Sequence, residues 1–128
     1  MFEMKTKCTF DAAHRVPGYP GKCDRLHGHT WTAAARVRGE ETDDLGMLVD
    51  FRGLRNALKE VTDAFDHQYL NELSDFAGVV PSAENIARII YKKLSSSEIF
   101  SGQGAWLYDV EVWESPHSSV RYFEKEES

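Results

Sequence analysis

The sequence predicts an α+β fold, in which two helices cover one face of a four-stranded antiparallel sheet and the elements follow the order ββααββ. Two segments with a two-residue alternation of apolar residues begin the chain, two segments with helical spacing follow, and two further strand-like segments end it. The chain has 128 residues, of which 41% are hydrophobic. We therefore expect one domain with a buried core over residues 1–128.

The first two strands are predicted on either side of a long loop. Every second residue from Met4 to His14 would face the interior, so that Cys8 is a small buried residue and His14 projects inward at the strand end. The alternation returns from His29 to Arg38. The segment between them is rich in proline and glycine and cannot form regular structure throughout. Two strands joined in this way would bring His14 and His29 together.

Two amphipathic helices are predicted in the middle of the chain. In the first, apolar residues recur at spacings of three and four, and Asp50 is placed to cap the N-terminus. The second begins after Pro81, with Ser82 as its N-cap. The side chains that we expect to be buried are Phe51, Leu54, Leu58, Val61 and Phe65 in the first helix, and Ile86, Ile89, Ile90 and Leu94 in the second.

The last two strands, over residues 105–114 and 118–125, are joined by a turn that contains His117. Alternation would place Asp109 and Glu111 on the wetter face of the first strand. Glu114 would end the apolar stripe, where a buried carboxylate needs a partner and could recognise a ligand with two parallel N–H donors. Alternatively, the strand end is exposed and Glu114 is solvated. The residues predicted to share the apolar face are Trp106, Tyr108, Val110, Val112 and Glu114.

The predicted sheet has two unpaired edges. A protein must cover or pair such edges, because their free backbone groups invite association with other chains. The strands are long and rich in aromatic and β-branched residues. We therefore expect copies of the chain to assemble edge to edge into a larger barrel.

The composition argues against several classes of function. A formal net charge of −6 leaves no basic surface for nucleic acid. No apolar run approaches the ~20 residues of a membrane span, and the N-terminus lacks the apolar segment of a signal peptide. We expect a cytoplasmic protein whose two cysteines are free or bind metal, and whose acidic tail, residues 124–128, is flexible.

A group of histidines predicts a metal site. His27 and His29 stand two residues apart, so their side chains leave the same face of an extended segment, and Gly28 between them adds no bulk. With His14 from the neighbouring strand they could form three corners of a tetrahedral zinc site whose fourth position is open, as in catalytic sites. The spacing also allows a closed site in which Cys23 is the fourth ligand, or histidines that serve only as polar contacts.

Two further groups could take part in chemistry. Lys22 and Arg25 flank Cys23, and nearby cations favour the reactive thiolate. Asp66 and His67 follow the first helix, and an Asp–His pair can tune an imidazole as an acid or a base. The alternative for this pair is that Asp66 caps a turn and His67 is a surface residue.

Several motifs occur together in one order, namely FDAAHRV, CDRLHGHTW, FDHQYLN, PSAENIA and a penultimate strand that ends in glutamate. With these motifs the chain resembles the 6-pyruvoyltetrahydropterin synthase family of tunnelling-fold proteins over residues 10–122. The cysteine separated by three residues from HGH is similar to the bacterial branch, 6-carboxy-5,6,7,8-tetrahydropterin synthase, which acts in the biosynthesis of queuosine and other 7-deazapurines. The pyruvoyl-forming animal enzymes typically have a longer gap.

The resemblance implies a role for each candidate residue. It implies that the three histidines bind zinc, and that Cys23 is the catalytic thiol rather than a metal ligand. It implies that Asp66 and His67 complete the catalytic triad, delivered from a neighbouring subunit. It also implies that Glu114 anchors the amino-pyrimidinone edge of a pterin.

Substrate-binding residues in the segment PSAEN are implied less completely. Ala83 departs from the family's usual threonine-containing segment, so only Ser82 and Glu84 are carried over to this chain. Helix N-terminal amides there could still serve a polar ring. We also expect Arg15, Lys22 and Arg25 to assist a triphosphate leaving group.

The resemblance implies a reaction and an assembly. The reaction is conversion of 7,8-dihydroneopterin triphosphate to 6-carboxytetrahydropterin with release of acetaldehyde and triphosphate. The assembly is a homohexamer of two stacked trimers with active sites at subunit interfaces. The alternatives are a triphosphate lyase of the 6-pyruvoyltetrahydropterin synthase type and a non-catalytic binding module stabilised by zinc.

Overall fold

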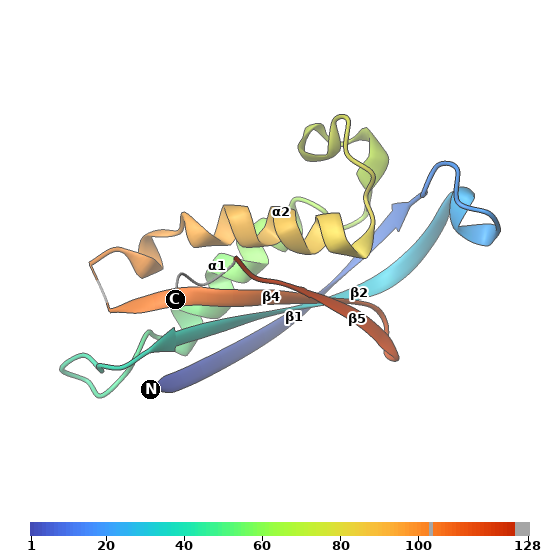
Figure 1. Cartoon of the computed structure of the whole chain (residues 1–128). Coiled ribbons are helices and arrows are strands. Elements are labelled where there is room, and N and C mark those ends of the chain that lie inside the picture. Colours follow the sequence, from blue (N-terminus) through green and yellow to red (C-terminus); the bar gives the residue numbers. More distant parts are fainter. Residues whose placement is uncertain (103, 125–128) are drawn as a thin grey trace.

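A computed structural model describes residues 1–102 and 104–124, with the exception of the side chain of Cys23. Two helices lie on one side of a mixed sheet whose strand order is β3-β1-β2-β4-β5 (Figure 1). The α+β class and the predicted order of the main elements are confirmed. The strands are β1 (Phe2–His14), β2 (His27–Gly39), β3 (Gln68–Tyr69), β4 (Ala105–Ser115) and β5 (Ser118–Tyr122), and the helices are α1 (Phe51–Asp63) and α2 (Ala83–Ser95). Short 3-10 turns are η1 (Lys22–Asp24), η2 (Leu70–Glu72), η3 (Ser74–Phe76) and η4 (Glu98–Phe100).

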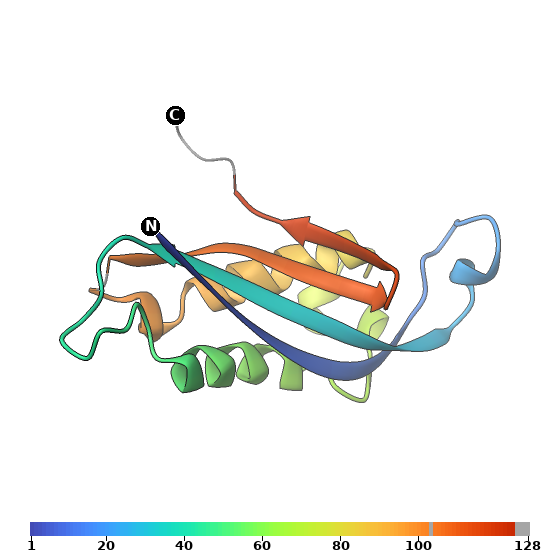
Figure 2. The same ribbon diagram turned by 90° about the horizontal axis from the view of Figure 1, so that it is seen from below.

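Strands β1 and β2 form a long antiparallel hairpin, which carries the histidines of the candidate site (Figure 2). Their ladder runs without interruption from Phe2 opposite Gly39 to His14 opposite His27. The predicted inward face is confirmed, because Phe10, His14 and Trp31 are each at most 2% exposed. Cys8 lies half-buried on the same face, with its Sγ 3.3 Å from Thr62 Oγ1 of α1.

The two helices begin where their predicted caps place them. Asp50 accepts hydrogen bonds from the N–H groups of Arg52 and Gly53 at the start of α1, and Ser82 accepts one from Asn85 at the start of α2. The buried faces of both helices pack on the sheet, and their side chains join those of β1, β2 and β4 in one core. The predicted burial of Phe51 is wrong, because this first residue of α1 is 61% exposed, and Phe65 is buried but lies beyond the end of α1. Among the described residues, no helix is long and apolar enough to cross a membrane.

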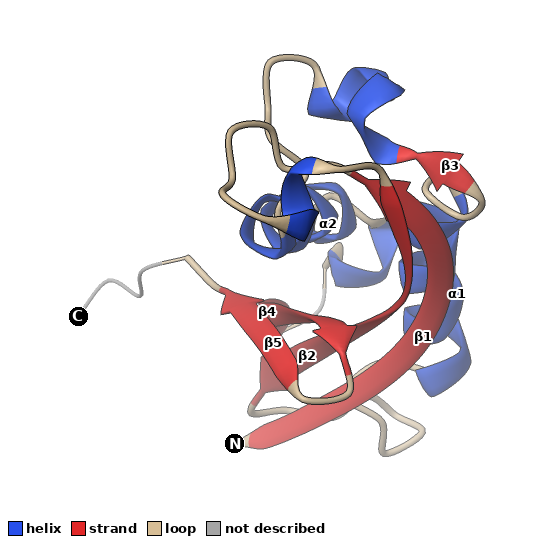
Figure 3. Ribbon diagram, turned by 90° about the vertical axis from the view of Figure 1, so that its right-hand side faces the viewer, coloured by secondary structure: helices blue, strands red, loops and turns tan. Residues whose placement is uncertain are grey.

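The sheet contains a fifth strand that the sequence did not predict. Strand β3 has two residues and pairs in parallel with Ala12 and Ala13 at the outer edge of β1 (Figure 3). It begins directly after His67, whose backbone has a positive φ of 58°. A two-residue strand carries no alternation, so its pattern was too short to identify, and the predicted all-antiparallel sheet of four strands is wrong in this respect.

The prediction of strict alternation along the whole of β4 is also wrong. The ladder with β2 shifts between Arg36 and Val37, so that Tyr108 is an extra residue on β4, a β-bulge that reverses the faces on its N-terminal side. As a result Leu107 belongs to the core, whereas Trp106 is 43% exposed. The predicted inward position of Trp106 and Tyr108 is therefore incorrect.

The predicted wetter face of β4 carries a buried charge network. Asp109 and Glu111 are 0% and 9% exposed, and Arg36 of β2 donates hydrogen bonds to both. Arg121 Nε of β5 donates to Asp109 at 2.6 Å, and the Ser119 hydroxyl donates to Glu111 at 2.7 Å. Burial alone would raise the pKa of Glu111, but the bonds from Ser119 and Arg36 lower it overall. These carboxylates are tied together, not solvated as expected.

The predicted acidic tail lies only partly within the described residues. Glu124 accepts a hydrogen bond from Lys92 Nζ of α2 at 2.9 Å, so this first tail residue is held against the helix. Residues 125–128, including the last predicted residue of the final strand, lie outside the described part of the chain.

Candidate metal centre and active site

Three histidine side chains converge at the end of the β1–β2 hairpin. His14 lies directly opposite His27 in the ladder, and Ala12 lies opposite His29, so the three imidazoles leave the face that the helices cover. The Nε2 atoms of His14 and His27 are 2.9 Å apart. With Glu114 of β4 included, the four potential ligand atoms all lie within 4.8 Å of one another, a group that could hold a metal ion.

Backbone carbonyls fix two of these rings. The Nδ1 atom of His14 donates a hydrogen bond to Pro81 O at 2.7 Å, and that of His27 donates to Arg25 O at 2.6 Å. A neutral imidazole that donates from Nδ1 carries a lone pair on Nε2. Two such lone pairs therefore face each other across 2.9 Å, an arrangement that a cation between them would stabilise.

His14 is held neutral by its surroundings. Burial lowers its pKa most strongly, the hydrogen bond to Pro81 works in the opposite direction, and neighbouring His27 lowers it further. The ring is 1% exposed and lies edge-on to Trp31 at a centroid distance of 4.9 Å. Trp31 also contacts His29 and donates from its indole nitrogen to Ala12 O. The floor of the cluster is thus apolar and rigid.

Glu114 completes the cluster from the end of β4. Its Oε1 atom lies 2.9 Å from His29 Nε2 and 3.8 Å from His14 Nε2. The buried Nε2 atom of His29 nevertheless has no hydrogen-bond partner. Three imidazoles and a carboxylate suit a divalent first-row metal ion, and the unpartnered nitrogen is what such an ion would satisfy. The residues present therefore fit the metal that the sequence predicts.

Asp66 and His67 form a second cluster on the outer side of β1. The Asp66 carboxylate accepts from the backbone N–H of Asp11 at 2.8 Å and lies 3.0 Å from His67 Nδ1. These two contacts, the first of them stronger, lower the pKa of Asp66. The N–H of His67 donates to Asp11 O at 2.6 Å, which holds the left-handed backbone of His67 in place. Asp11 Oδ1 in turn accepts from the Thr30 hydroxyl.

The two clusters lie at different places along the end of β1. Asp11 and Thr30 pair with each other across the ladder, one step from Ala12 and His29. Side chains one step apart point to opposite faces, so the Asp11 side chain faces away from the three histidines. Asp66 and His67 precede β3 and bond the backbone of Asp11 at the outer edge of β1. A hollow of about 530 Å³ opens here, lined by residues of both clusters, including His29 and His67, and the His67 side chain is 77% exposed.

The loop that carries Cys23 is folded around Asp24. Arg15 donates to both the backbone and the carboxylate of Asp24, and Gly18 N–H also donates to this carboxylate. Cys23 belongs to η1, but its side chain lies outside the described part of the structure. Arg15 is thus already engaged in shaping the loop, whereas Lys22 and Arg25 are exposed.

The start of α2 lies beside the histidines. Pro81, which accepts the hydrogen bond from His14, directly precedes the cap residue Ser82. The Ser82 hydroxyl is engaged in capping Asn85 N–H, and Glu84 is exposed in the first helical turn. The predicted substrate-binding segment is therefore adjacent to the metal cluster through one carbonyl contact.

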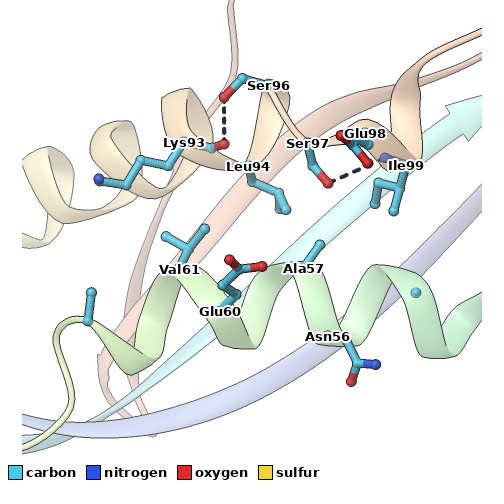
Figure 4. Close-up of a pocket in the computed structure, with 12 residues that line it drawn as sticks. Asn56, Ala57, Glu60, Val61, Lys93, Leu94, Ser96, Ser97, Glu98 and Ile99 are labelled. Atoms are coloured by element: carbon cyan, nitrogen blue, oxygen red, sulfur yellow. Dashed lines mark hydrogen bonds between the residues drawn. The ribbon is translucent and has the colours of Figure 1, made fainter.

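A separate hollow of about 740 Å³ lies between α1 and the end of α2 (Figure 4). Its lining contains no histidine. Its serine hydroxyls already bond the helix ends, since Ser96 donates to Lys93 O and Ser97 accepts from Ile99 N–H. It offers no group of metal ligands, so the candidate site remains at the hairpin end.

Sequence reasoning missed several groups that shape both clusters. The carbonyls of Arg25 and Pro81 orient the histidines, and Asp11 and Thr30 support Asp66 and His67. Backbone carbonyls leave no signal in a sequence. The alternation did predict that Asp11 faces outward, but not its contacts with Asp66 and Thr30.

Comparison with known proteins identifies relatives over nearly the whole chain. A family model described as 6-pyruvoyl tetrahydropterin synthase matches residues 3–125. A Haemophilus influenzae protein named 6-carboxy-5,6,7,8-tetrahydropterin synthase is 30% identical, over 97% of this chain and all of that protein. A protein of the same name from Synechocystis is 35% identical, over 90% of this chain and 88% of that protein. The solved 6-pyruvoyl tetrahydropterin synthase of Caenorhabditis elegans superposes with a TM-score of 0.83 at 29% identity, covering 97% of this chain and 96% of that one.

Proposed function

Because the chain belongs to the 6-pyruvoyl tetrahydropterin synthase family, we propose that it is a zinc-dependent 6-carboxy-5,6,7,8-tetrahydropterin synthase. It would convert 7,8-dihydroneopterin triphosphate to 6-carboxytetrahydropterin, with release of acetaldehyde and triphosphate. The names of the bacterial relatives and the three-residue gap between Cys23 and HGH support this activity. The product would enter the biosynthesis of queuosine and related 7-deazapurines in the cytoplasm.

The observation that carries the proposal is the convergence of three imidazole nitrogens in a half-buried cluster. In the proposal His14, His27 and His29 bind zinc, for which three neutral nitrogen ligands are well suited. The bound ion would supply a Lewis acid for the oxygens of the substrate's side chain. The carbonyls of Pro81 and Arg25 keep two of the rings in the tautomer that binding requires.

The remaining residues hold substrate and move protons. Cys23, as a thiolate favoured by neighbouring cations, would accept a carbon-bound proton from the substrate side chain. His67, oriented by the Asp66 carboxylate, would pass protons on the opposite side of the substrate. Glu114 would bind the amino-pyrimidinone edge, with Ser82 and Glu84 at the start of α2 as further substrate contacts.

We also propose that the active site is shared between copies of the chain, assembled as a hexamer of two trimers. In one copy the Asp66–His67 pair bonds the Asp11 backbone at the outer edge of β1, and in the proposal a second copy brings such a pair to each histidine cluster. The sheet offers edges for this assembly. Among the described residues, β3 covers only Ala12 and Ala13 at the outer edge of β1, and β5 pairs only with β4.

Product analysis tests the proposed reaction. The purified protein is incubated with 7,8-dihydroneopterin triphosphate, its zinc content is measured in parallel, and the products are identified by mass spectrometry. We expect 6-carboxytetrahydropterin and acetaldehyde in equal amounts. A 6-pyruvoyl product without acetaldehyde would instead support the second activity of the family, which the name of the Caenorhabditis elegans neighbour favours.

A further inference from the structure

Glu114 stands at an irregular point of the sheet. The ladder between β2 and β4 ends at Trp113, and the ladder between β4 and β5 passes from Trp113 to Ser115 without pairing Glu114. A bulge of this kind turns a side chain away from its regular direction and weakens its backbone restraint. Glu114 thus lies close to the histidines at a point where the ladders leave its backbone unpaired.

The contact between Glu114 and His29 has the geometry of two ligands rather than of a hydrogen bond. Oε1 lies 2.9 Å from His29 Nε2, yet that nitrogen has no hydrogen-bond partner, so its lone pair does not point at the carboxylate. Two ligands of one zinc ion lie about 3.3 Å apart when each bond is about 2.0–2.1 Å, and each points at the ion. The distances of Oε1 to His29 and His14, 2.9 and 3.8 Å, bracket this separation.

We propose that Glu114 is an exchangeable fourth ligand of the metal ion. In the substrate-free protein its carboxylate closes the coordination of the ion held by the three histidines. When an amino-pyrimidinone edge arrives, the carboxylate leaves the metal and binds the two N–H donors of that edge, which opens one coordination position. This exchange rests on the proposed function, whereas the ligation in the substrate-free protein does not.

The position of the side chain suits such an exchange. Glu114 is 33% exposed, so an incoming ligand can reach its carboxylate from solvent, while His14 behind it is fixed and buried. The Glu114 carboxylate cannot bind the metal ion and the amino-pyrimidinone edge fully at the same time, because both interactions use its lone pairs. Substrate binding and an open metal position would therefore be coupled through one residue.

Metal binding to variants of the whole chain tests the ligation. Zinc affinity is measured by competition with a chromophoric chelator for the wild type, Glu114→Ala and the isosteric Glu114→Gln, with Glu98→Gln, an exposed carboxylate in η4, as the control. We expect both Glu114 variants to bind zinc on the order of 10- to 100-fold more weakly, and their cobalt(II) forms to differ from the wild type in visible absorption. Unchanged affinity and an unchanged cobalt spectrum in both variants would overturn the proposal. Thermal unfolding of the metal-free proteins checks that the fold is retained.

Unsubstituted pterin tests the exchange, because it offers the amino-pyrimidinone edge but no side chain that could bind the metal. Titrated into the cobalt form of the wild type, it should move the absorption spectrum toward that of Glu114→Ala. Bound pterin with an unchanged spectrum would refute the exchange, and so would failure of the pterin to bind. Failure of the proposed function is separate, since it appears as missing 6-carboxytetrahydropterin while the metal affinities stand unaffected.

Discussion

The histidine cluster and the Asp66–His67 pair both lie along the end of β1, but they are held in different ways. The histidines face the helices, and His14 is 1% exposed with its ring fixed by a carbonyl. The pair faces outward, with the His67 side chain 77% exposed, and backbone bonds to Asp11 hold it. The histidines thus form a fixed group that could hold a metal ion, whereas the Asp66–His67 pair is open to solvent.

This difference indicates how a small chain can provide a complete active site. The histidines come from the strands themselves, whereas the pair precedes β3 and bonds the edge of β1. In the proposed symmetric assembly, every interface would supply the same pair to a neighbouring histidine cluster.

The largest effect is expected from His27→Ala. The substitution removes one of the converging nitrogens, and we expect zinc affinity to fall more than about 100-fold, beyond the loss typical of a supporting group, with loss of turnover. Metal analysis measures the loss of zinc, and product formation measures the loss of turnover. His117→Ala, which removes an exposed loop histidine, is the control and should retain metal and activity.

Cys23→Ala separates catalysis from metal binding. We expect zinc content and thermal stability like those of the wild type, with turnover reduced about 10³- to 10⁴-fold, the upper range for a lost acid–base group. Zinc loss together with unfolding would instead identify a closed site in which the thiol is a ligand.

His67→Ala changes only the outward pair. We expect unchanged zinc affinity and turnover reduced about 10²-fold, near the lower end of the range, because water can relay protons at an exposed position. Steady-state kinetics measure the effect. If the variant lost zinc as well, the two clusters would not be independent as the geometry requires.

The smallest effect concerns the ionisation of Asp66. The Asp11 N–H and His67 lower its folded-state pKa, so the carboxylate and its bonds persist below the ordinary value of about 3.9 and are lost only as the pH falls through the lowered pKa. An NMR titration of the carboxyl carbon should give a lower midpoint than the same carboxyl in the urea-unfolded chain. Equal midpoints would contradict the hydrogen bond from Asp11.

Much of the fold followed from patterns that the sequence displays. The alternation around His14 and His29, and the caps Asp50 and Ser82, are local features whose physics is nearly independent of the rest of the chain. The reversal at Tyr108 was not predictable in this way. A β-bulge depends on how two strands pair, so alternation read from one strand alone misplaced Trp106.

In the candidate site, too, features of a single hairpin could be predicted, whereas contacts that depend on the pairing of further strands could not. The spacing of His27 and His29, and their pairing with His14, could be anticipated because one hairpin determines both. Alternation also placed Glu114 on the core face, but its distance of 2.9 Å from His29 could not be anticipated, because it depends on how β2 and β4 pair. The buried pairing of Asp109 with Arg36 and Arg121 was missed for a similar reason, since three strands meet there.

The most direct test of the shared site combines two inactive variants. Cys23→Ala and His67→Ala chains, carrying different affinity tags, are expressed together, and mixed assemblies are purified through both tags. If each site takes its thiol from one copy and its acid–base pair from a neighbour, random mixing at equal amounts restores about one quarter of the sites and hence of wild-type turnover. Mixed assemblies as inactive as the two parent variants would contradict the account.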